Sequence, residues 1–195
     1  LTILVDPDEA PWAWPTEEHH LSQNWTIAGG KASATTPTFF GANPAEVMDG
    51  PMKGRRALAA EAELARAFLA ALTDEQRAKI RIAFDSGERM NWQFVPIARK
   101  GLPLKEMTEP QRKVAFELLK TGLSASGYTK AETIRSLENV LRAQSGSATR
   151  DPELYFFSIF GDPDGASWGW RYEGHHLSQN WTIAGGKASA TTPAF

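Results

Sequence analysis

The chain has 195 residues, of which 42% are hydrophobic, with ten Phe and seven Trp among them. A chain of this size and composition can fill a hydrophobic core, which excludes disorder as a description of the whole protein. The formal net charge is −2 and the Lys and Arg residues are scattered along the sequence, so we expect no nucleic-acid partner. No apolar run approaches the roughly 20 residues that span a bilayer, so we expect no membrane partner. The absence of cysteine excludes disulfides and thiolate metal sites.

The chain begins and ends with the same sequence. Residues 19–37 and 175–193 both read HHLSQNWTIAGGKASATTP, and the identity falls off over the residues before each copy. The two copies carry all four histidines of the chain, which are His19, His20, His175 and His176. We predict a single domain over residues 1–195, in which residues 1–39 and 157–195 are a repeated β segment and residues 40–156 are mostly helical.

The pattern inside the repeat predicts a strand with one core face and one polar face. Because alternate side chains of a strand point to opposite faces, one face would hold His175, Leu177, Trp181 and Ile183, and the other His176, Ser178, Asn180 and Thr182. The first copy is preceded by Pro15 where the second has Arg171, and proline removes a hydrogen-bond donor from a sheet. We therefore expect the second copy to be the better formed of the two.

Three capping boxes predict helix starts in the middle of the chain. Each has a Thr three residues before a Glu or Gln: Thr73 with Gln76, Thr108 with Gln111, and Thr129 with Glu132. Residues 54–72 are Ala-rich and carry apolar residues at helical spacing, which predicts a further helix before the first box. Residues 90–100 have the pattern of an extended connection.

The residues around the second copy are typical of strands. Residues 154–160 are rich in aromatic and β-branched side chains, and the Asp-Pro-Asp-Gly sequence at 162–165 predicts a turn. The segments that follow predict an antiparallel meander. The fold class is therefore α+β, with an antiparallel sheet of terminal hairpins packed against about four helices.

The repeat has three interpretations. In the first interpretation, both copies lie side by side in one sheet, as an ordinary internal repeat. Alternatively, the chain is a permuted or overlapping slice of a longer or tandem protein. In the third interpretation the surplus copy pairs with another molecule, which gives swapped dimers or open chains and makes self-association through the repeated strand a candidate interaction.

Four sequence blocks touch most of the chain. They are residues 91–96 with 99–104, residues 150–155 with 159–161, residues 168–178 (WGWRYEGHHLS), and residues 36–47 with 58–61. These blocks resemble a large bacterial family catalogued only as domain of unknown function number 3500. In that family the fourth block follows the other three, so the chain looks like a rotated or overlapping version of the family's N-terminal half. The resemblance implies an exported protein, although the chain shows no signal peptide. It implies no established reaction, so whether the protein is an enzyme stays open.

The paired histidines with a nearby carboxylate are the strongest chemical signal in the sequence. Imidazole and carboxylate groups are the usual ligands of Zn, Fe, Mn and Cu. We therefore predict a divalent metal site at Glu173, His175 and His176, with His19 and His20 as its counterpart in the first copy. Glu173 and His175 would share a strand face, whereas adjacent histidines point apart unless the strand ends or bulges there. The alternative is that one histidine bonds to the backbone in the core and the other is solvated.

Two hypotheses of function follow from these patterns. The first is a metal-dependent enzyme or a ligand-binding domain that uses the histidine cluster, with a small-molecule ligand that the sequence does not identify. The second is a non-catalytic interaction or self-assembly module, in which the duplicated segment pairs with a neighbouring chain. Bound metal would support the first hypothesis, and concentration-dependent assembly would support the second.

Overall fold

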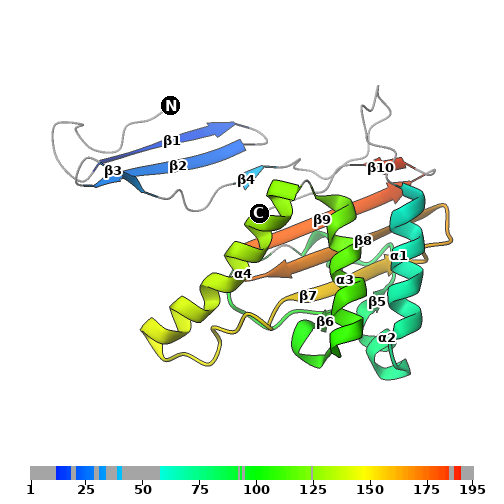
Figure 1. Ribbon diagram of the computed structural model, residues 1–195. Coiled ribbons are helices and arrows are strands. Elements are labelled where there is room, and N and C mark those ends of the chain that lie inside the picture. Colours follow the sequence, from blue (N-terminus) through cyan, green and yellow to red (C-terminus); the bar gives the residue numbers. More distant parts are fainter. Residues whose placement is uncertain are drawn as a thin grey trace.

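The structure is a computed structural model that describes residues 12–18, 21–28, 31–33, 39–40, 58–91, 93, 95–123, 125–184 and 187–189. One sheet contains β1 (Trp12–Glu18), β2 (Leu21–Ala28), β3 (Lys31–Ser33) and β4 (Phe39–Phe40) (Figure 1). The other contains β5 (Arg81–Ile82), β6 (Leu102–Pro103), β7 (Phe156–Gly161), β8 (Ser167–Gly174), β9 (Leu177–Ala184) and β10 (Lys187–Ser189). We call the second of these the main sheet.

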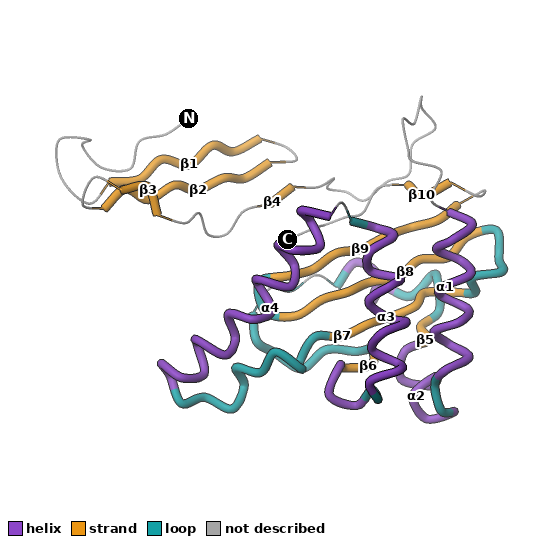
Figure 2. The backbone as a smooth tube through the Cα atoms, viewed as in Figure 1, coloured by secondary structure: helices purple, strands orange, loops and turns teal. Residues whose placement is uncertain are grey.

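Four α-helices accompany the main sheet, which confirms the α+β prediction. They are α1 (Leu58–Ala71), α2 (Asp74–Ile80), α3 (Glu109–Gly122) and α4 (Ala125–Ser145), with short 3₁₀ turns η1 (Gly87–Met90) and η2 (Leu104–Glu106). Helices α1, α3 and α4 lie across one face of the sheet (Figure 2). None of the helices in the described part of the chain is long and apolar enough to cross a membrane.

Two of the three predicted helix starts are confirmed. The Gln76 amide donates to Thr73 Oγ1 over 3.3 Å at the start of α2, and the Thr108 amide donates to Gln111 Oε1 over 2.8 Å at the start of α3. The third prediction is wrong, because α4 already begins at Ala125. The Thr129 hydroxyl lies inside that helix and donates to the Ala125 carbonyl over 3.0 Å. A Thr that bonds back one turn resembles a cap in sequence but continues the helix.

The main sheet is mixed, whereas we expected only antiparallel pairs. Its order is β10-β9-β8-β7-β5, with β6 also paired to β7, and the pair of β5 with β7 is parallel, with Arg81 opposite Ile159. Parallel neighbours need a crossover between them, and α3 and α4 lie between these two strands in the sequence. All other strand pairs of the main sheet are antiparallel.

Both faces of the central strands are covered. Toward the helices, the Phe157 ring packs edge-on against Phe68 of α1, with centroids 5.6 Å apart, and Tyr172 packs against Phe116 of α3. The buried core on this face comes from helices and central strands: Ala65, Phe68, Leu118, Leu119, Phe157, Ile159, Trp168, Trp170 and Tyr172. The opposite face carries Arg171 and Glu173, which are also buried. The described residues 86–91, 93 and 95–101, which form no strand, contact that face, and we call these residues the strap.

The two copies of the repeat form the same antiparallel pair in different sheets. Trp12 lies opposite Ile27 in β1 and β2, as Trp168 lies opposite Ile183 in β8 and β9. The described strands therefore do not place both copies side by side in one sheet. Our expectation that Pro15 damages its strand is wrong, because β1 pairs through Pro15 along its whole length. The reason is position: β1 is the end strand in the order β1-β2-β3, where a missing donor is tolerated, whereas β8 lies between β7 and β9.

Candidate functional site

His175 and His176 lie in the turn between β8 and β9. The first strand ends at Gly174 and the second begins at Leu177, so the histidines form a two-residue connection, with His176 in the left-handed region at φ 56°. Positive φ values are what such tight connections require. The prediction that the histidines alternate along a strand is therefore wrong. The turn brings their ring centroids to 4.0 Å from each other. His19 and His20, the predicted counterparts, lie outside the described residues.

Tyr155 fixes the position of this turn. Its side chain is fully buried, and its hydroxyl donates to the His175 carbonyl over 2.7 Å. Burial raises the pKa of Tyr155 above its ordinary value, so the hydroxyl keeps its proton and remains a donor. A Cβ atom at residue 174 would lie 2.4 Å from a carbon of the Tyr155 ring, which only glycine avoids. Gly174, which has no Cβ, therefore allows the Tyr155 ring to pack directly against the backbone.

The His175 ring is held between a carboxylate and a guanidinium. Its Nδ1 lies 2.5 Å from Glu138 Oε1 on α4, and Arg150 Nη1 lies 2.9 Å from Nε2 and 3.0 Å from Nδ1. A guanidinium only donates and an ionised carboxylate only accepts. The tautomer with its proton on Nδ1 satisfies both partners, because Nδ1 then donates to Glu138 and Nε2 accepts from Arg150. His175 and Glu138 are both buried.

His176 occupies the more open side of the turn and is half-buried. Burial lowers the pKa of His176, and the neighbouring His175 lowers it further, while Glu138 opposes the shift. The neutral form of His176 is therefore favoured over the charged form. A neutral imidazole can accept a hydrogen bond from a ligand or bind a metal ion.

Glu173 contacts a different layer of the protein from His175. Its carboxylate oxygens lie 3.2 Å from Arg171 Nη1 and 3.5 Å from Arg99 Nε, on the sheet face that the strap covers. Burial raises the pKa of Glu173, and the two guanidinium groups oppose that shift. The structure thus brings His175 and His176 together but directs Glu173 to arginines instead of to the histidines.

The same two arginines hold the strap against the sheet. Arg171 donates through Nη2 to the Glu88 carbonyl over 2.7 Å and to the Arg89 carbonyl over 2.9 Å. Arg99 donates through its own Nη2 to the Val95 carbonyl over 2.7 Å and to the Gly174 carbonyl, just before the turn, over 3.1 Å. Removing either side chain would leave several main-chain carbonyls without this donor.

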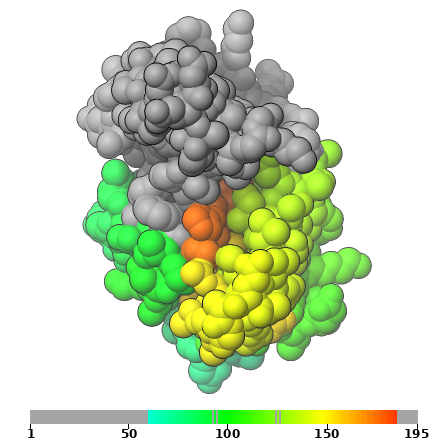
Figure 3. Space-filling view, turned by 90° about the vertical axis from the view of Figure 1, so that its left-hand side faces the viewer, coloured from blue at the N-terminus to red at the C-terminus, as the bar shows by residue number. Residues whose placement is uncertain are grey.

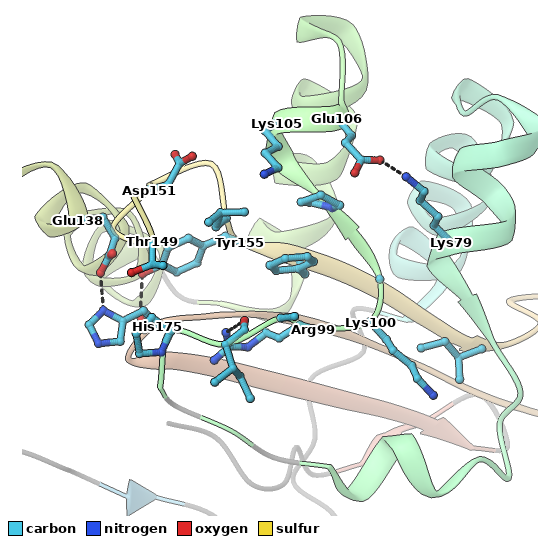
Figure 4. A pocket seen from close by; sticks show the side chains of 18 of the residues that line it. Lys79, Arg99, Lys100, Lys105, Glu106, Glu138, Thr149, Asp151, Tyr155 and His175 are labelled. Atoms are coloured by element: carbon cyan, nitrogen blue, oxygen red, sulfur yellow. Dashed lines mark hydrogen bonds and ion pairs between the residues drawn. The ribbon is translucent and has the colours of Figure 1, made fainter. Parts of the chain in front are cut away.

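A cleft of about 830 Å³ lies beside the turn, with Glu138 and His175 at one end (Figure 4). It is lined by Ala78, Lys79, Arg81, Ile82, residues 96–101, Pro103, Lys105, Glu106, Glu138, Thr149, Asp151, residues 154–156 and His175. In the space-filling view the orange β8–β9 part of the chain reaches the surface between the yellow segment before β7 and green segments (Figure 3). A second cavity of about 330 Å³ is lined by Glu173 and by strap residues that include Glu88 and Arg99.

Glu138 and Arg150 were not among the residues that the sequence predicted for the site. A signal for Glu138 exists, because it follows Ile134 by one turn and precedes Leu141, so it falls on the apolar stripe of its helix. A carboxylate at such a position needs a buried partner. Which partner it meets depends on the packing of α4 against the β8–β9 turn, which a helix pattern does not contain.

The predicted metal site at Glu173, His175 and His176 stays a prediction. In the described part of the chain, no group of three or more His, Asp or Glu side chains is placed to hold a metal ion. His175 would have to give up Arg150 or Glu138 to offer a ring nitrogen to a cation. Any metal that binds through His175 would therefore need a rearrangement of these side chains.

Comparison with known proteins identifies the family. A family model described as "Protein of unknown function (DUF3500)" matches residues 1–82 and residues 62–195, and each match contains one copy of the repeat. No curated protein matches the chain, and no solved structure does. The two matches together cover the whole sequence. The chain therefore belongs to the DUF3500 family.

Proposed function

We propose that this domain binds a small molecule in the cleft beside the β8–β9 turn and that His175 exchanges a proton with the bound molecule. The observation that carries the proposal is the His175–Glu138 pair, 2.5 Å apart and buried, at the end of a cleft of about 830 Å³. A cleft of this volume is in the range that holds small ligands. A carboxylate behind an imidazole fixes its tautomer and stabilises the charge that forms when the ring accepts a proton.

Arg150 would control whether His175 can accept that proton. A charged imidazole has N–H groups on both nitrogens, so it cannot accept the hydrogen bond that Arg150 Nη1 makes to Nε2 over 2.9 Å. Uptake of a proton by His175 thus requires Arg150 to turn away. A proton-donating group at the His175 end of the ligand would supply the proton, and the positive charge that the ring then carries would repel the guanidinium of Arg150.

Protein-observed NMR with a fragment library tests the binding proposal. We expect fragments to shift the amide signals of Ala98 and Leu154, which line the cleft, and the binding to weaken in His175→Gln. The matched control is His19→Gln, which makes the same change in the first copy and should leave the binding unchanged. A library in which no chemical class shifts the cleft signals would overturn the proposal.

Self-association through the first copy is the second candidate function. The observation that favours it is the place of β1 at the end of its sheet, where one side pairs with no other described strand. Unpaired strand edges can add a strand from another molecule. Sedimentation velocity over a concentration series tests this candidate: a rising mass supports it, and a constant monomer mass excludes it.

A further inference from the structure

Resting on the proposed function, we infer that the ligand of the cleft is an organic anion with an apolar body. In this arrangement the anionic group lies toward Lys79 and Lys105 and the apolar body lies along the strap. The inference names a class of ligand and rests on three features of the lining: its charge, the distribution of that charge, and its apolar surface.

The lining carries more positive than negative side chains. Its cations are Lys79, Arg81, Arg99, Lys100 and Lys105, and its anions are Glu106, Glu138 and Asp151. Five cations against three anions is an excess of two positive charges, whereas the whole chain has a net charge of −2. Carboxylates outside the lining pair with three of these cations, Arg81 with Asp162, Lys100 with Glu88 and Arg99 with Glu173, so the charge that can attract an anion lies on Lys79 and Lys105.

The cations are unevenly distributed and unevenly paired. Figure 4 shows Lys79 across the cleft from Glu138 and His175, with Lys105 and Glu106 between them. Lys79 Nζ lies 2.5 Å from Glu106 Oε2, so this carboxylate is already engaged. Lys105 makes no side-chain ion pair among the described residues, and its main chain is fixed by an amide hydrogen bond to the Glu153 carbonyl. Lys105 is thus a positioned cation with its charge available.

Arg99 is not available to a ligand in the same way. Arg99 donates to the carbonyls of Gln93, Val95, Ile97 and Gly174, and its Nε lies 3.5 Å from Glu173. Its side chain is almost completely buried. Recognition of the anion therefore falls to Lys79 and Lys105, which are point charges on flexible stems and suit a carboxylate or a phosphate alike.

Apart from Gly101, Thr149, Tyr155 and His175, the remaining lining is apolar, which selects against a small inorganic anion. It consists of Ala78, Ile82, Pro96, Ile97, Ala98, Pro103, Leu154 and Phe156. Ile97 is 45% exposed although it is a large apolar side chain. Inorganic phosphate would leave this surface in water, whereas an organic acid covers it and gains the hydrophobic contribution of that burial.

Titrations with three probes test the inference: 3-phenylpropionate, 3-phenyl-1-propanol and inorganic phosphate. We expect 3-phenylpropionate to shift the Ala98 and Leu154 signals and to bind at least about tenfold more tightly than either of the other probes. Lys105→Gln should weaken 3-phenylpropionate about tenfold. Lys113→Gln is the matched control, because Lys113 is exposed on α3 and does not line the cleft.

Each outcome decides a separate part of the inference. Equal affinity for the alcohol would overturn the anionic requirement, and equal affinity for phosphate would overturn the apolar one. Equal losses in Lys105→Gln and Lys113→Gln would overturn the role of Lys105. If library fragments bind the cleft but 3-phenylpropionate does not, the inference about ligand class fails and the proposed function stands. If nothing binds the cleft, the proposed function fails as well.

Discussion

The two copies of the repeat share nineteen identical residues and one strand register, yet they belong to different sheets with different neighbours. The second copy continues a sheet in which β8 is paired on both sides, by β7 and β9. In the first copy, β1 has only β2 beside it among the described strands. The nineteen identical residues therefore do not determine which sheet their strand pair joins.

The residues before the identical part account for the difference. The second copy has Gly169, Arg171 and Gly174 where the first has Ala13, Pro15 and Glu18. In the main sheet a Cβ at 169 would lie 2.6 Å from the Trp181 carbonyl oxygen, and a Cβ at 174 would lie 2.4 Å from the Tyr155 ring. Residue 171 supplies the guanidinium that holds the strap. The first copy thus lacks the two glycines and the arginine that the main sheet requires. This difference disfavours an exchange in which β1 and β2 take the place of β8 and β9 in the main sheet.

The largest effect is expected when Arg171 is replaced by the first-copy residue. Arg171→Pro removes a donor from a central strand and leaves Glu173 buried without its closest cation, 3.2 Å away. Breaking a buried ion pair alone costs about 3–5 kcal/mol, which is comparable to the stability of many domains. We expect no cooperative unfolding transition by circular dichroism. The reverse change, Pro15→Arg, should leave the transition of the main sheet in place, and a folded Arg171→Pro protein would contradict the comparison.

Gly174→Glu should have the next largest effect. The new side chain would overlap the Tyr155 ring, which cannot retreat because it is fully buried and its hydroxyl holds the His175 carbonyl. Overpacking of this kind costs about 1–3 kcal/mol even for an added methyl group, so Gly174→Ala gives a milder form of the same test. Urea unfolding measures both. If Gly174→Ala and the control Glu18→Gly are equally neutral, the close approach of Tyr155 is not a constraint in solution.

The pKa of Glu61 reports whether α1 packs against the rest of the fold in solution as it does in the structure. Burial raises its pKa to about 7 from an ordinary value of 4.5. Because the folded state holds this proton more tightly than the unfolded chain, Glu61 destabilises the fold increasingly as the pH rises from 4.5 to about 7. We expect Glu61→Gln to gain on the order of 2 kcal/mol relative to wild type between these limits. Glu63→Gln, at an exposed position, is the control and should show no such pH dependence.

The smallest effect is expected from metal removal. Both ring nitrogens of His175 already have partners, so dialysis against a chelator should leave the unfolding midpoint unchanged. Elemental analysis of protein purified without an affinity tag accompanies the measurement. Stoichiometric metal that is lost in His175→Gln but kept in His19→Gln would instead support the metal site that the sequence predicted.

Local patterns predicted what depends on local interactions. The capping boxes at Thr73 and Thr108 predicted helix starts because each contains both partners of its hydrogen bonds. The sequence also predicted the strand Phe156–Gly161, from its aromatic and β-branched side chains. It predicted the turn at residues 162–165, in which the Gly165 amide donates to the Asp162 carbonyl. The family blocks were also recognised from sequence alone.

The site was predicted only in part, because its contacts join distant segments. His175 and His176 were identified, but their tight turn was mistaken for a continuous strand, since nothing in the sequence marks His176 as left-handed. Glu173 was assigned to the histidines by spacing, while the structure gives it to Arg99, 74 residues earlier in the chain (173 − 99), and to Arg171. Such pairings depend on which layer covers each sheet face, and strand periodicity does not specify that layer.

The central claim is that Glu138 holds His175 of the β8–β9 turn in the tautomer with its proton on Nδ1. Long-range ¹H–¹⁵N spectra of the histidine side chains at about pH 8, where free histidine is neutral, test it directly. We predict one signal set with the proton on Nδ1, absent in His175→Gln, perturbed in Glu138→Gln and unchanged in His19→Gln. A proton on Nε2 of His175, or a His175 signal set that Glu138→Gln leaves unchanged, would contradict the account.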